Sequence, residues 1–206
     1  KRVDFINYWL YTFTATCLLC LVEPFVAICL GQAFVLTKAI LILAVAIYYF
    51  KGINSGIDIA KNAAGLYYPD RFIPMAEAIA NMVISIVLAK RYGIAGVLFG
   101  TLVSFLALSF WAKPYFVCRD VFEVSFARYA VREGREIVVS VLVAAGTWYA
   151  VSLVSLENVL LSFGVKALLA LALSNGLLLL VYFKTSEFQY LRGLLESAAN
   201  RIGKRK

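Results

Sequence analysis

Long apolar runs separated by short polar segments dominate this sequence. Residues 5–22, 92–112 and 137–156 contain no charged side chain, and residues 158–183 contain only Lys166. A helix needs about 20 apolar residues to cross roughly 30 Å of hydrocarbon. Because lipid cannot hydrogen-bond the backbone, a helix is the favoured form for such segments. The pattern therefore predicts four transmembrane helices.

Two weaker runs raise the predicted number to six. Residues 72–89 carry Glu77 within an apolar stretch, and residues 33–57 have a charge-free centre, 39–50, between Lys38 and Lys51. The shorter run can cross a bilayer if both lysines extend toward the headgroups. We therefore predict an all-α membrane protein, a bundle of about six transmembrane helices.

The same pattern predicts four segments along the chain. Residues 1–112 hold four transmembrane helices, 113–136 form a cytoplasmic interfacial connector, 137–184 hold two further helices, and 185–206 form a basic amphipathic cytoplasmic tail. Pro114 is expected to end the fourth helix. Glycine and proline predict loops at 51–56 and 65–71. Because the chain begins with Lys1 and has no secretory signal pattern, we expect it to be the C-terminal part of a longer protein, or a trimmed form of one.

The distribution of charge predicts the orientation of the chain and argues against nucleic acid as a partner. The chain is 63% hydrophobic and 16% charged, against roughly 25% charged in soluble domains, and its net charge is +8. In a soluble protein such a charge would suggest nucleic acid. Here, with the N-terminus inside, only Lys38, Lys90, Arg91 and Lys166 of the 20 basic residues fall outside the cytoplasm. This bias predicts that both termini are cytoplasmic.

Two intramembrane features are candidates for function. Glu77 and Asn81 lie four residues apart and share a helix face. A carboxylate facing lipid is costly, so this face should point into the bundle or a wet cavity, unless Glu77 reaches the headgroups. Pro24 interrupts the first helix, which we expect to stop at Gly31. These two residues form either a hinge or a fixed bend.

Several patterns favour packing over chemistry. Gly93, Gly96 and Gly100 would allow close helix approach, and Cys17 and Cys20 sit within an apolar helix with no second cysteine pair. The sequence has no histidine and no phosphate-binding loop, which excludes Ser-His-Asp triads, HExxH zinc sites and ATP hydrolysis by this chain. We therefore expect no enzyme, cofactor or metal site.

Four motifs in a fixed order carry a family resemblance. They are EPFVAICLG at 23–31, AGLYYPDRFIP at 64–74 followed by Glu77 through Asn81, KRYGIAGVLFGT at 90–101, and KPYF at 113–116 with Val121-Phe122 soon after. In this order and spacing the chain resembles the C-terminal half of Wzx-like polysaccharide flippases of the multidrug/oligosaccharidyl-lipid/polysaccharide exporter superfamily. The resemblance covers residues 5–129 best, and the last two helices match in position and hydrophobicity alone.

The resemblance implies a fold and an activity. Members have two helical lobes around a cavity and move undecaprenyl-diphosphate-linked oligosaccharide across the bacterial cytoplasmic (inner) membrane by alternating access, for capsule, O-antigen or lipopolysaccharide synthesis. This chain would supply the second, MATE-like lobe, and its partners would be the lipid-linked oligosaccharide, membrane lipids and the N-terminal lobe of the same protein. Basic residues such as Lys61, Arg71 and Arg91 would neutralise the diphosphate, with Glu77 and Asn81 as further substrate-binding candidates.

Three other functions fit parts of the sequence. One is a drug or metabolite cation antiporter of the same superfamily, for which Glu23 and Glu77 are the acidic residues available. Another is a membrane-embedded enzyme of polysaccharide synthesis, which would usually need a histidine or a large external loop. The third is a structural membrane protein without a transport role.

Overall fold

Apolar helices of membrane-crossing length make up the described chain. A computed structural model describes residues 2–66, 68, 71–122, 124–154 and 159–183. Its long helices are α1 (Arg2–Cys29), α2 (Lys38–Ala63), α3 (Ile73–Tyr92), α4 (Ile94–Ser104), α5 (Phe110–Asp120), α6 (Phe126–Ser152) and α7 (Val159–Tyr182). A 3-10 turn, η1 (Gln32–Phe34), follows α1, and a π-helical segment, η2 (Phe105–Ser109), joins α4 to α5 in one helix, Ile94–Asp120. Six helices are thus long and apolar enough to cross a membrane, which confirms the predicted helical bundle.

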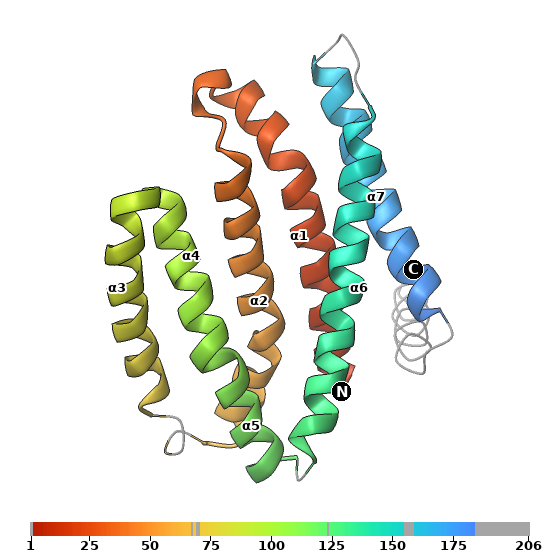
Figure 1. Ribbon diagram of the computed structural model, residues 1–206. Coiled ribbons are helices and arrows are strands. Elements are labelled where there is room, and N and C mark those ends of the chain that lie inside the picture. The colour runs from red at the N-terminus through yellow and green to blue at the C-terminus, as the bar shows by residue number, and fades with distance from the viewer. Residues whose placement is uncertain (1, 67, 69–70, 123, 155–158, 184–206) are drawn as a thin grey trace, which may run out of the picture.

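The helix α1 is the centre of the bundle. It packs against α2, α6 and α7, while α3 packs against α4 and η2 at the edge (Figure 1). Both ends of the described chain lie at the same end of the bundle, below in Figure 1. The turn after α1 and the α3–α4 turn lie at the opposite end. We call these the N-terminal end and the opposite end; the predicted orientation makes the N-terminal end cytoplasmic. The predicted tail, residues 185–206, lies outside the described residues.

The predicted loop at 51–56 is wrong, because these residues lie within α2. The glycines there serve helix packing. A Cβ at Gly52 would overlap the ring of Tyr11 on α1, and a Cβ at Gly56 would lie 3.1 Å from Nδ2 of Asn7. Small residues let membrane helices approach closely. The glycines therefore mark the α1–α2 contact.

Neither intramembrane proline ends its helix. Pro24 lies inside α1, and Pro114 lies inside α5, which continues to Asp120. The prediction that Pro114 ends the fourth helix is wrong, and so is the separate connector at 113–136. Its residues belong to the end of α5 and the start of α6, joined by the short segment 121–125. In lipid, unwinding would expose more backbone groups than the one that proline leaves unbonded, so the helix persists.

Buried apolar clusters hold the helices together on both sides of α1. One cluster joins α1 to α6 and α7 and contains Phe5, Tyr8, Val143, Leu178 and Tyr182. The other joins α1 to α2 and the helix Ile94–Asp120 and contains Ala15, Tyr49, Ile53, Phe105 and Phe110. An ion pair of 3.0 Å between Lys113 and Asp58 also links α5 to α2.

Candidate functional site

The basic residues expected to bind a diphosphate do not form one site. Lys61 lies in the last turn of α2, and Arg71 precedes α3, with its guanidinium 4.1 Å from the ring centre of Tyr68. Arg91 is in the last turn of α3. That helix has 20 residues and is therefore roughly 30 Å long at 1.5 Å per residue. Arg91 is thus at the opposite end of the bundle from Lys61 and Arg71.

Glu77 and Asn81 face the neighbouring helix of the α3–α4 hairpin. Ser109, in the π-helical segment, donates a hydrogen bond to the Glu77 carboxylate. The Asn81 side-chain oxygen accepts hydrogen bonds from Ser85 at 2.8 Å and Thr101 at 3.3 Å. Their shared face therefore contacts protein, as expected for a face that points into the bundle. Both polar side chains have hydrogen-bond partners there.

Glycines bring the two helices of this hairpin together. A Cβ at Gly96 would overlap the Leu88 backbone, and a Cβ at Gly100 would lie 2.6 Å from Oγ of Ser85. Gly93, with φ +57°, forms the turn between the helices. The predicted packing role is confirmed for Gly96 and Gly100, whereas Gly93 has no neighbour within 4 Å of a Cβ and serves the turn.

A different feature unites residues from three helices. A groove of about 350 Å³ follows α1 between α2 and α6. Along α1 it extends from Thr12 to Glu23, a rise of roughly 17 Å at 1.5 Å per residue. Its walls are mainly aliphatic and aromatic and include Leu19, Leu41, Val45, Phe50, Val141 and Ala144. A surface of this kind suits a hydrocarbon chain.

Hydrogen bonds between three helices lie at the Thr12 end of the groove. Tyr49 of α2 donates to Oγ of Ser140 on α6 at 2.8 Å, and the hydroxyls of Ser140 and Thr12 on α1 lie 2.7 Å apart. Ser140 also donates to the Glu136 carbonyl at 3.0 Å, so Thr12 supplies the proton of its bond to Ser140. All three hydroxyl side chains are buried. They fasten α1, α2 and α6 together at one level of the bundle.

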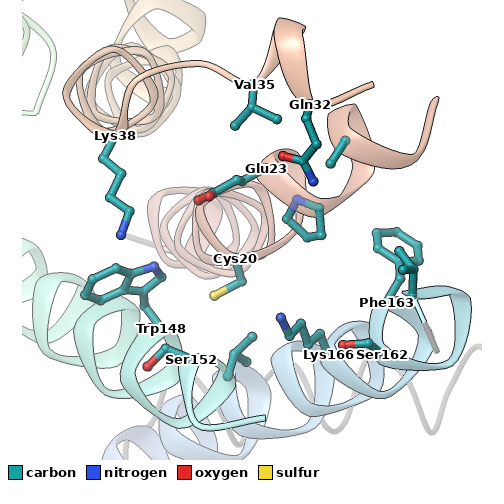
Figure 2. Close-up of a pocket in the computed structure, with 14 residues that line it drawn as sticks. Cys20, Glu23, Gln32, Val35, Lys38, Trp148, Ser152, Ser162, Phe163 and Lys166 are labelled. Carbon is teal, nitrogen blue, oxygen red and sulfur yellow. The ribbon is translucent and has the colours of Figure 1, made fainter. Parts of the chain in front are cut away.

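The Glu23 end of the groove is charged and adjoins a second cavity. Glu23, Lys38 and Trp148 line both spaces, and the second cavity, of about 400 Å³, adds Gln32 and Lys166 (Figure 2). Figure 2 shows the Lys166 amine pointing into this cavity from α7. The Lys38 amine lies 5.9 Å from the centre of the Trp148 ring, within the range of a cation–π contact.

We call this second cavity the mouth of the groove, and its charge is predominantly positive. Two lysines and one carboxylate line the cavity. Across the part of the chain that the structure describes, neither Glu23 nor Lys166 forms an ion pair. The hydroxyls of Ser152 and Ser162 are further polar groups in the wall. The mouth can therefore bind an anionic group that also accepts hydrogen bonds.

The hinge candidates lie beside this mouth. Pro24 lines the cavity, and Gly31 follows the end of α1 with φ +96°, a left-handed conformation that favours glycine. Gly31 therefore marks the end of the first helix, as predicted. A change in the angle of the α1 end would alter the shape of the cavity.

Sequence reasoning noted the charges of this site without assembling them. Lys166 is the only charge in residues 158–183, and Lys38 begins a membrane segment. Such isolated intramembrane charges are the signal that could have identified the site. Trp148 gave no signal. Comparison with known proteins adds nothing here, since no family model, curated protein or solved structure matches the chain.

Proposed function

We propose that this chain is one lobe of a transporter that carries an undecaprenyl-diphosphate-linked oligosaccharide across the bacterial cytoplasmic membrane by alternating access. One observation carries the proposal: a groove that is apolar along its length ends in a cationic, hydroxyl-lined mouth. An isoprenoid diphosphate has the same division into a hydrocarbon chain and an anionic head. The motif resemblance adds the substrate class and the polysaccharide pathway.

The arrangement suits the physical difficulty of this transport. A sugar diphosphate cannot cross hydrocarbon alone, because removing its charges and hydroxyls from water is prohibitively costly. In the proposed complex the isoprenoid tail lies along the groove, next to the bilayer. The diphosphate lies at the mouth, within reach of Lys38 and Lys166. The sugars face the polar cavity and the other lobe.

The charges at the mouth favour an anionic over a cationic substrate. Lys38 and Lys166 outnumber the single carboxylate, Glu23. A cationic drug would meet net repulsion there, which argues against the antiporter alternative. The carboxylate remains available to accept hydrogen bonds from sugar hydroxyls.

Binding of undecaprenyl diphosphate to the chain in nanodiscs tests the charged part of the proposal. We expect Lys38→Gln and Lys166→Gln each to weaken binding about tenfold, the effect of losing one charge-assisted hydrogen bond. Lys90→Gln is the matched control, because Lys90 is an exposed lysine of α3 outside the groove. Equal binding by all three variants would overturn the assignment of the mouth.

A second pair of variants tests the apolar part. Ala145 lines the groove on α6, whereas Leu142 is exposed on the same helix and lies outside it. Ala145→Trp should fill the groove and abolish binding of undecaprenyl diphosphate, and Leu142→Trp should not. In cells, the complete protein with Ala145→Trp should fail to support surface polysaccharide. Normal polymer from this variant would refute the transport role of the groove.

A further inference from the structure

A third cavity, which shares no lining residue with the groove or its mouth, lies at the N-terminal end of the bundle. Its volume is about 550 Å³, and its walls come from the start of α1, α2, the end of α5, the segment 121–125 and the first turns of α6. Arg132 in this cavity and Trp148 at the groove mouth are separated along α6 by roughly 24 Å at 1.5 Å per residue. This third cavity and the mouth of the groove therefore lie toward opposite ends of α6.

Three arginines of α6 form the polar wall of this cavity. Arg128, Arg132 and Arg135 follow the i, i+4, i+7 spacing of one helix face. Arg132 is engaged, since its Nε donates to the buried Glu136 carboxylate at 2.9 Å. Arg128 and Arg135 are exposed, and their side chains form no ion pair or hydrogen bond within the described ranges. Two guanidinium groups are thus available to a ligand.

The acidic groups that the structure describes around the cavity do not cancel this charge. Asp4 is the one carboxylate among the lining residues that the structure describes. Glu136 is paired with Arg132, and Glu133 is buried and does not line the cavity. The lining residues that the structure describes therefore carry three guanidinium groups against one carboxylate, which suits a phosphate group bound by more than one arginine.

Apolar side chains complete the rim of the cavity. Phe122, Val124 and Val131 line it and are 45%, 40% and 75% exposed. A ligand that is anionic at one point and apolar next to it would cover both surfaces. The C-terminal tail of the chain does not match, because residues 184–206 have six basic and two acidic residues.

We propose that this cavity binds the headgroup phosphate of an anionic membrane phospholipid, with the upper acyl chains against the apolar rim. Basic pockets between membrane helices at the cytoplasmic surface are suited to such headgroups. The site is independent of the proposed transport, because it shares no residue with the groove or its mouth. It would anchor α6 and the start of α1 to the cytoplasmic leaflet.

Native mass spectrometry of the complete chain, with phosphatidylglycerol or phosphatidylcholine added, tests this site. We expect phosphatidylglycerol to bind more tightly, and Arg128→Gln/Arg135→Gln to weaken it roughly 30-fold, since each arginine near a membrane surface contributes about a fivefold factor. Arg119→Gln is the matched control. Arg119 is an exposed arginine at the same end that is bonded to Asp120 at 2.6 Å and lies outside the cavity.

Three results would overturn the proposal. They are equal affinity for the two phospholipids, unchanged phosphatidylglycerol binding by the double variant, and competition at this site in which undecaprenyl diphosphate displaces phosphatidylglycerol at lower concentration. The last result would assign the cavity to the transported substrate. Arg128→Lys/Arg135→Lys keeps the charge and should retain most of the binding, which separates loss of charge from loss of fold.

Discussion

Replacing Gly96 with alanine should separate α3 from α4. The nearest atoms to a Cβ at this position belong to the backbone of Leu88, whose carbonyl carbon would be only 2.5 Å away. Ordinary contacts of a Cβ begin at 3.4 Å, so α4 must move by about 0.9 Å. The backbone of α3 cannot rotate aside as a side chain can.

The expected cost follows from this displacement. A radial gap of 0.5–1 Å loses roughly a quarter to a half of each affected dispersion contact, and α3 has its main contacts with α4 and η2. Overpacking of this kind costs about 1–3 kcal/mol. Alanine regains up to about 1 kcal/mol of helix propensity. We therefore expect Gly96→Ala to lower the free energy of unfolding by roughly 1–2 kcal/mol.

Gly164→Ala provides the control for helix propensity. Gly164 lies in α7, and a Cβ there would meet nothing within 4 Å. This variant should be unchanged or up to about 1 kcal/mol more stable. Unfolding in mixed micelles of increasing denaturing detergent measures both variants. If Gly96→Ala is as stable as Gly164→Ala, the close contact between the two helices is refuted.

Three further predictions concern other parts of the bundle. Tyr49→Phe should destabilise the protein by about 1 kcal/mol, because it removes a buried interhelical hydrogen bond; Tyr48→Phe, whose bond to Thr14 is exposed, should have little effect in the same micelle titration. Gly31→Ala should cost about 1 kcal/mol through its positive φ, measured in the same way. A membrane-impermeant maleimide should label exposed Cys29 from outside intact cells, and buried Cys118 should stay unlabelled; labelling of Cys29 only after lysis would reverse the predicted orientation.

The hydrophobic pattern was sufficient to predict the helices, but local signals misplaced their ends. Pro114 was predicted to end the fourth helix, and Gly52 and Gly56 were predicted to lie in a loop. Those signals apply to proteins in water, which can hydrogen-bond the backbone groups of an unwound segment. In lipid the helix continues, and glycine instead permits close contact between helices.

The candidate site depended on information that no local pattern contains. Glu23 and Lys38 come from the consecutive helices α1 and α2, but Lys166 comes from α7, far along the sequence. They meet because α1 packs against both of the other helices. Individual charges could be recognised as unusual within apolar segments, but their convergence depends on helix packing.

The edge position of α3 has a consequence for the choice of membrane. This helix has 20 residues, shorter than the 24 to 28 of α1, α2, α6 and α7. Arg71 lies at one end, and Arg91 and Tyr92 lie at the other; arginine and tyrosine are residue types that anchor a helix to the headgroup layers. Because the longer helices can tilt to match a thin bilayer, hydrophobic mismatch in a thicker one falls first on α3. Longer lipid tails would therefore strain the α3–α4 hairpin before the longer helices.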